Sequence, residues 1–231
     1  ENVDRMRFFV NRKGVKPSIF HMTELIVTNE DVPIITDPVL PKGKLLDEIG
    51  QSMIHQWPEK TKSVEEMSNR LKKQLEDSKN QAWPERFTKW GGDKTKKLAR
   101  GSGFFKTYYD GKRWWLLDPE GYAFWSAGLD CIRVDTEAGY NQLESALTFL
   151  PGTDSEYAGI YQPLEWSSVK LINYLAANFI RTFGKEGWRE KWADIALSEL
   201  KKMRFNTVGN WAEYEYAAKA EFPYTIPMSF E

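Results

Sequence analysis

The segment 122–129 is an almost continuous run of apolar and small residues. A strand that is buried on both faces has this composition, and such strands are typical of the parallel sheets of α/β proteins. Further along the chain, 205–211 and 224–230 favour strands and 213–220 favours a short helix. The order from residue 122 therefore predicts the first three βα units of a (β/α)8 barrel, or of another parallel α/β fold.

Three amphipathic helices are predicted from apolar residues at spacings of three and four. The first follows a capping box, in which the Ser63 hydroxyl and the Glu66 carboxylate bond free backbone N–H groups. The second is capped by Ser167 or Ser168 and ends before Gly184. Their apolar stripes are, in order, Val64, Met67, Leu71 and Leu75; Leu171, Ile172, Leu175 and Phe179; and Trp188, Trp192, Ala196, Leu200 and Met203.

An antiparallel hairpin is predicted just before the apolar run. Strands at 104–109 and 112–117 flank Asp110-Gly111, a common hairpin turn because glycine tolerates positive φ. The next four residues, 118–121, place Asp, Pro and Gly as a type I turn requires. Adjacent strand residues face opposite ways, so of Trp114 and Trp115 one is expected to be buried and the other to cover the bottom of the barrel.

The rest of the chain divides into two further regions. Strand-like segments within 5–27 are too few to form a stable sheet alone, so 1–30 is interpreted as the end of a β domain. Residues 31–102 are interpreted as a proline-containing connector with one helix. The hairpin and the start of the barrel occupy 103–231.

Composition excludes several classes of function. Lys+Arg is 32 and Asp+Glu is 33, so the chain lacks the excess of positive charge that is typical of proteins binding nucleic acid or an anionic membrane. No apolar run reaches the roughly 20 residues of a membrane-spanning helix. The first residues lack a signal peptide, so either the protein is not exported or its signal lies outside this sequence. With one cysteine, Cys131, and two histidines, His21 and His55, no internal disulfide, metal site or cofactor is predicted.

Several ordered motifs resemble those of agarase-like glycoside hydrolases, in particular the family 50 β-agarases. The resemblance covers about 45–231 and, more weakly, 1–30. It implies a (β/α)8 barrel preceded by a carbohydrate-binding-like jelly roll, whose last strands are then 1–30. The motifs are Gly50-Gln51, Trp57-Pro58-Glu59-Lys60, Gly103-Phe104-Phe105, 110–121, Phe124-Trp125-Ser126-Ala127-Gly128, Phe149-Leu150-Pro151, 188–192 and 204–211.

The resemblance implies hydrolysis of a β-linked galactan such as agarose, by a secreted or periplasmic enzyme. It also implies a retaining mechanism with two glutamates, at the ends of strands four and seven, which must lie about 5–5.5 Å apart. A complete barrel takes about 250 residues, so the segment from Tyr122 to Glu231 has room for three strands. We therefore expect the chain to be a fragment, with both acids in the remainder of the barrel. Glu231 is given no catalytic role, and the chain alone is expected to be inactive.

Substrate contacts are predicted at the C-terminal ends of the strands, where barrels bind ligands. These positions are Asp130 and Arg133 after the first strand, and Asn210, Trp211 and Glu213 after the second. An amide both donates to and accepts from sugar hydroxyls, and an indole offers a flat apolar face. Two structural alternatives stay open. In the first, Asn210 caps the next helix and Trp211 packs against it; in the second, Asp130 and Arg133 form an ion pair.

Two other functions remain possible: a non-catalytic carbohydrate-binding protein, and a structural or interaction domain without a glycan ligand. The aromatic content of 14% suits stacking on sugar rings, although a well-filled core explains most of it. Cys131 has no partner for a catalytic triad and is expected to be a small buried hydrophobic residue.

Overall fold

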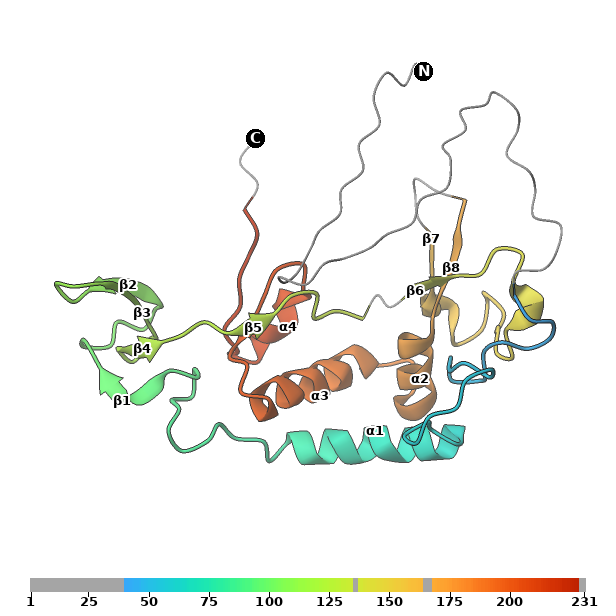
Figure 1. Ribbon diagram of the computed structural model, residues 1–231, viewed down its shortest axis with the longest axis horizontal. Coiled ribbons are helices and arrows are strands. Elements are labelled where there is room, and N and C mark those ends of the chain that lie inside the picture. Colours follow the sequence, from blue (N-terminus) through green and yellow to red (C-terminus); the bar gives the residue numbers. More distant parts are fainter. Residues whose placement is uncertain (1–39, 135–136, 164–167, 229–231) are drawn as a thin grey trace, which may run out of the picture. The chain divides into compact units, whose positions relative to one another are not determined.

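The computed structural model describes residues 40–134, 137–163 and 168–228 (Figure 1). The chain divides into two units, Glu1–Leu40 and Pro41–Glu231, and the elements below belong to the second. The predicted β domain at 1–30 lies outside the described residues, as do Ser167 and Glu231. Among the described residues, no helix is long and apolar enough to span a membrane.

An antiparallel sheet of four strands contains the predicted hairpin. Its order is β1-β4-β3-β2, and its strands are β1 (Asp93–Lys97), β2 (Lys106–Tyr109), β3 (Trp114–Leu117) and β4 (Tyr122–Phe124). The hairpin turn is held by Asp110, whose Oδ1 accepts from the backbone N–H groups of Lys112 and Arg113 at 2.8 and 2.9 Å. β1 lies in the range interpreted as a connector, yet it pairs with β4.

We expect this hairpin to lose stability in acid because of Asp110. The Trp115 indole N–H, which donates to Oδ2 at 2.6 Å, and then the N–H groups of Arg113 and Lys112 lower the pKa of Asp110 to about 2. The folded-state pKa lies below the ordinary value of 3.8. The carboxylate therefore contributes stability above that value, and this stability is lost as the pH falls through about 2.

The Lys112 and Arg113 amide resonances, followed by NMR from pH 5 to pH 1.5, measure this transition. The Asp110→Asn variant keeps an acceptor oxygen but does not titrate, so the transition should disappear. An unchanged transition in that variant would contradict the assignment.

The predicted single strand at 122–129 is wrong, because the chain changes sheets within it. β4 ends at Phe124, and β5 (Gly128–Leu129) pairs in parallel with β9 (Thr207–Val208). Between them the side chain of Trp125 is 85% exposed. The small residues of the run allow close approach, since a Cβ on Gly128 would lie 2.0 Å from the carbonyl oxygen of Thr207.

The parallel part of the fold continues beyond β9. The helix α4 (Tyr214–Lys219) follows, and Tyr224 then forms a parallel bridge with Val208. Three chain segments therefore lie side by side in parallel, joined by helices. The strands predicted at 205–211 and 224–230 are shorter than expected: β9 has two residues, and only the bridge at Tyr224 represents the third within the described chain. Three complete βα units remain a prediction.

A second antiparallel sheet interrupts the connection after β5. It consists of β6 (Glu137–Gly139), β7 (Tyr161–Pro163) and β8 (Lys170–Asn173), in the order β6-β8-β7. Two short 3-10 helices, Glu144–Ala146 and Ala158–Ile160, lie between β6 and β7.

The helix predicted after Ser168 begins later than expected. Leu171 and Ile172 belong to β8, and the helix α2 (Tyr174–Phe183) is capped by Asn173, whose side chain accepts from the Ala176 N–H at 2.8 Å. The same Asn173 side chain donates to the Val134 carbonyl, which links this cap to the segment after β5. Gly184 ends the helix with φ of 85°, as predicted.

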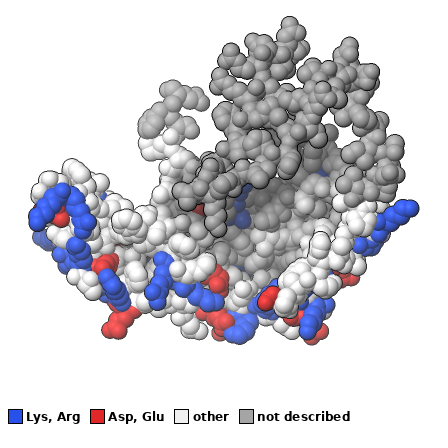
Figure 2. Space-filling model, viewed as in Figure 1, with Lys and Arg blue, Asp and Glu red and all other residues white. Residues whose placement is uncertain are grey.

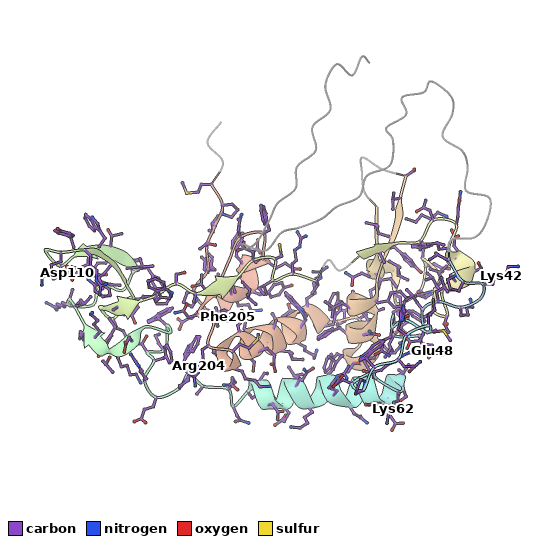
Figure 3. The ribbon with its side chains drawn as sticks, in the orientation of Figure 1. Lys42, Glu48, Lys62, Asp110, Arg204 and Phe205 are labelled. Carbon is purple, nitrogen blue, oxygen red and sulfur yellow. The ribbon has the colours of Figure 1, made fainter. Side chains whose placement is uncertain are left out.

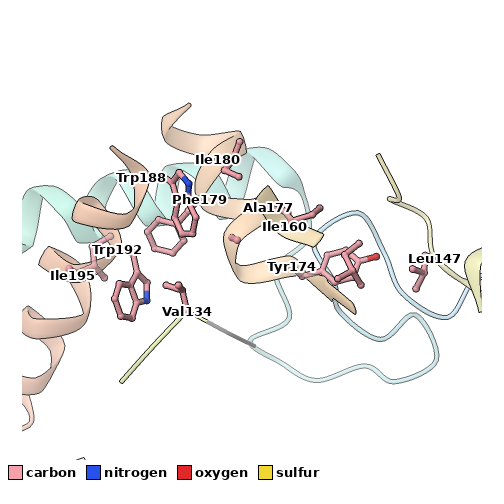
Figure 4. Packing of buried hydrophobic residues seen from close by; sticks show 13 residues of the cluster. Val134, Leu147, Ile160, Tyr174, Ala177, Phe179, Ile180, Trp188, Trp192 and Ile195 are labelled. Carbon is pink, nitrogen blue, oxygen red and sulfur yellow. The ribbon is translucent and has the colours of Figure 1, made fainter. Parts of the chain in front are cut away.

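The other two predicted helices are confirmed and form the core with α2. In α1 (Val64–Ser78) the Ser63 hydroxyl accepts from the Glu66 N–H at 3.0 Å, while the Glu66 carboxylate accepts from Lys62 rather than from Ser63. α3 (Trp188–Lys202) and α2 both pack against α1. Figure 4 shows the buried cluster that they share with the segments around 134, 147 and 160; it includes Val134, Leu147, Ile160, Phe179, Ile180, Trp188, Trp192 and Ile195.

Candidate functional site

Asp130 and Asn210 meet at the C-terminal ends of the two parallel strands. Asp130 follows β5 and Asn210 lies two residues after β9, and the Asp130 carboxylate accepts from the backbone N–H of Asn210 at 2.8 Å. Two backbone bonds continue the pairing at this edge, from Gly209 N–H to the Leu129 carbonyl and from Cys131 N–H to the Asn210 carbonyl, both 2.8 Å. The structure thus brings together two of the residues predicted from different parts of the sequence, through the side chain of Asp130 and the backbone of Asn210.

The residue after each member of this pair has an unusual backbone. Cys131 has φ of 58° and Trp211 has φ of 55°, a left-handed conformation that is uncommon for residues other than glycine. Such conformations cluster at functional sites, where surrounding structure holds them in place. Cys131 is exposed, so the expectation of a buried residue is wrong.

Trp211 does not pack against the next helix, and Asn210 does not cap it. The side chain of Trp211 is 64% exposed, which does not fit packing against α4. The residue at the N-cap of α4 is Glu213, and Asn210 makes no capping bond there. The Asn210 Oδ1 is buried and has no hydrogen-bond partner among the described residues, which is unusual for a buried polar atom.

Glu213 does not contact Asp130 or Asn210 through the bonds described here; it bonds the segment after β5 and the helix α3. Its Oε1 accepts from the Val134 N–H at 2.9 Å, and its Oε2 lies 3.2 Å from Nη1 of Arg189 on α3. The carboxylate therefore ties the segment after β5 to α3, and any role in ligand binding would use its remaining acceptor positions. Arg133 is exposed in that same segment. Within the described residues, no cluster of His, Cys, Asp or Glu could hold a metal ion.

The sequence analysis missed Asn206, which lies before β9. It joins the four-stranded antiparallel sheet to the parallel strands, at the N-terminal ends of β5 and β9. Its Oδ1 accepts from the Ala127 N–H, and its Nδ2 donates to the carbonyls of Gly91 and Trp125, each at 2.9 Å. The signal was an asparagine inside a predicted strand, where this residue type is depleted. A buried asparagine in such a position calls for a specific set of partners.

These features define the class of the protein as a mixed α/β chain with candidate ligand groups at the C-terminal edge of parallel strands. No family model matches it. It is similar to two β-agarases of Vibrio sp. (strain JT0107): β-agarase B, 28% identical over 195 residues, and β-agarase A, 31% identical over 126 residues. These alignments cover 73% and 48% of this chain but only 20% and 12% of the relatives.

Solved structures of agarases share the fold. The agarase AgWH50C is 25% identical with a TM-score of 0.67, over 79% of this chain and 29% of that one. An exo-β-agarase has a TM-score of 0.68 at 20% identity, over 81% of this chain and 32% of that one. The resemblance to family 50 β-agarases inferred from the sequence is therefore confirmed, and the chain spans about a third or less of each of these proteins.

Proposed function

We propose that the described residues from 103 onward form the entry hairpin and the opening part of the (β/α)8 barrel of a retaining β-agarase that acts on a β-linked galactan. The observation that carries this proposal is the parallel pairing of β5 with β9, with Asp130 and Asn210 side by side after the strands. In a barrel, ligands bind at this edge. The sequence and fold similarity to agarases supports the choice of substrate.

The remainder of the barrel is the proposed partner of this segment. Within the described chain, the parallel sheet has β5 and the Tyr224 bridge at its two edges. Beyond Tyr224, Ile226 and Met228 are exposed apolar residues. Open edges with apolar side chains associate with other strands, which is the contact that further barrel strands would make. Because the proposed substrate is a polysaccharide, we also propose a secreted or periplasmic location.

The side chains at the strand ends would bind sugar rather than break it. The exposed Asp130 carboxylate would accept one hydroxyl, the Asn210 amide would bond a second, and Trp211 would offer its exposed face to the C–H side of a pyranose. Arg133 would donate to ring or hydroxyl oxygens from the same edge. Glu213 would act by holding the segment that carries Arg133.

The two acids of a retaining mechanism must lie about 5–5.5 Å apart across the scissile bond. Among the described residues at this edge, Asp130 is fixed by the Asn210 N–H, and Glu213 is bonded to Val134 and Arg189. Both carboxylates already serve as acceptors for groups of this chain. The proposal therefore assigns both glutamates to later barrel strands.

Reducing-sugar release from agarose tests this proposal. We expect activity from a longer polypeptide that continues the barrel and none from the 231-residue chain. In the longer protein, Trp211→Ala should weaken substrate binding on the order of tenfold, seen as a raised KM, because it removes a stacking face. Trp114→Ala is the matched control, since Trp114 is equally exposed but lies on the hairpin. Activity in the 231-residue chain would refute the assignment of the acids.

A further inference from the structure

A cavity of about 520 Å³ lies at the other ends of the parallel strands. Its wall includes Trp125 and Ala127, which precede β5, and Arg204 and Asn206, which precede β9. Because parallel strands share the same direction, these residues lie at the edge opposite to Asp130 and Asn210. Residues of the four-stranded sheet complete the wall, and Figure 3 labels Arg204 at the end of α3 on the side of that sheet.

The charge of this cavity is positive. Arg86, Lys96 and Arg204 line it, and Asp93 is the acidic residue among its described lining. Arg86 donates to both carboxylate oxygens of Asp93, at 2.8 and 3.3 Å, and these bonds hold the pKa of Asp93 well below its usual range. The pair is thus neutralised internally, and Lys96 and Arg204 supply the net charge.

Neither of these two cations is paired with an acid within the described residues. Lys96 Nζ lies 3.9 Å from the centre of the Trp115 ring. Arg204 is exposed, with φ of 66°, at a position after a helix that normally favours glycine. Lys and Arg side chains also gather over the same sheet on the face shown in Figure 2.

The cavity also offers a flat aromatic surface. Trp115 and Trp125 both line it; Lys96 and Arg113 lie over the Trp115 ring, each 3.9 Å from its centre, whereas Trp125 is almost fully exposed although it lies between two strands. An indole face suits the apolar C–H side of a pyranose. A guanidinium binds oxyanions through two parallel N–H donors, and a lysine adds a mobile positive charge. Together these groups match a sugar chain that carries negatively charged substituents.

We propose that this cavity is a second carbohydrate site, which binds a galactan segment bearing sulfate esters. Lys96 and Arg204 hold the sulfate, and Trp125 stacks on the adjoining sugar ring. The choice of a galactan backbone rests on the proposed function, whereas the preference for an anionic chain follows from the lining charges alone. The site binds polymer and takes no part in bond cleavage, since it lies at the opposite strand ends from Asp130 and Asn210.

Binding is measured with the 231-residue chain attached to a sensor surface, which keeps molecules from associating. The probes are a κ-carrageenan oligosaccharide, which is a sulfated galactan, and a neutral agarose oligosaccharide of equal length. We expect the sulfated chain to bind roughly tenfold more tightly at low salt, as hydrogen bonds between charged groups allow. This advantage should shrink as salt screens the charges.

Variants locate the site. Lys96→Ala and Arg204→Ala should each lower affinity for the sulfated probe roughly threefold, together removing its advantage, and leave the neutral probe unaffected. Arg204→Lys should retain part of the affinity. Lys94→Ala is the matched control, because Lys94 is exposed on the same strand but does not line the cavity. Trp125→Ala should weaken both probes, and near-UV circular dichroism of each variant verifies folding.

Equal binding of the two probes, or an equal effect of Lys94→Ala and Lys96→Ala, would overturn the proposal. So would equally tight binding of a single-stranded DNA oligonucleotide, because it would indicate a general attraction for polyanions. Agarose hydrolysis by the longer polypeptide is a separate measurement. Trp211→Ala should raise the KM for agarose but leave the advantage of the sulfated probe over the neutral one unchanged, so a failure of this site and a failure of the proposed function are distinguishable.

Discussion

Replacing Asn206 with alanine should lower the free energy of unfolding by about 3–5 kcal/mol, since a buried side chain that bonds three backbone groups and the Thr207 hydroxyl is removed. The variant leaves the Ala127 N–H and the carbonyls of Gly91 and Trp125 without these partners. Each buried group that loses its partner costs about 1–3 kcal/mol. Asn206 connects the loop before β1, the segment between β4 and β5, and β9, so the loss should separate the two sheets.

Urea unfolding of the chain, followed by tryptophan fluorescence, measures this effect. Asn178→Ala is the matched control: Asn178 Nδ2 makes a single bond to the Ile49 carbonyl, at 3.0 Å, and its loss should cost about 1 kcal/mol. Asn206→Asp should also destabilise, because a carboxylate would face two carbonyl oxygens. If Asn206→Ala costs no more than Asn178→Ala, the proposed link between the sheets is not important for stability.

A methyl group on Gly128 should cost about 3 kcal/mol or more, at the upper end of the range for overpacking. The added Cβ would lie 2.0 Å from the carbonyl oxygen and 2.7 Å from the carbonyl carbon of Thr207. Neither atom is at the end of a flexible side chain, so the backbones of β5 and β9 must move apart. The pairing that positions Asp130 against Asn210 should then be lost.

Hydrogen exchange at the Gly209 and Cys131 amides reports this pairing directly, since both donate across the strand ends. Gly128→Ala should accelerate exchange at both amides. Gly159→Ala provides the comparison: a Cβ at Gly159 would meet no atom within 4 Å, and its φ is not in the left-handed region. Slow exchange at Gly209 in the Gly128→Ala protein would mean that the strands tolerate the added volume.

Local patterns in the sequence predicted much of the fold because they depend on neighbouring residues. The capping serine of α1 and the Asp110-Gly111 turn act within a few residues of themselves, and both are found as predicted. The prediction of one strand at 122–129 was wrong because it depended on a distant part of the chain. Whether Trp125 is inside a strand or between two sheets depends on Asn206, about eighty residues away, and composition does not reveal that partner.

The start of α2 shows a second limit. Leu171 and Ile172 continue the helical spacing of the residues that follow, but they pair with β6 and β7. Periodicity cannot separate a short strand from the first turn of a helix when both bury the same side chains. The Asn173 side chain, which caps α2 and bonds the Val134 carbonyl, decides where the helix begins.

The candidate site was predictable to the extent that strand ends define it. Asp130 and Asn210 lie at one edge because parallel strands bring their C-terminal ends together, whereas their contact with a substrate stays a prediction. The partners of Glu213 were not predictable, since Arg189 and Val134 reach it through the packing of α3 and the segment after β5. The cationic cavity was also missed, because its lining comes from segments spread from residue 86 to residue 206.

The sheet formed by β6, β7 and β8 lies in the chain between β5 and α2 and has its own strand pairing. Its hydrogen-bond ladder does not include β5 or β9. Mutations on its outer surface can therefore accumulate without disturbing the strands that hold Asp130 and Asn210. The surface of this sheet can therefore change during evolution while the parallel strands stay constant.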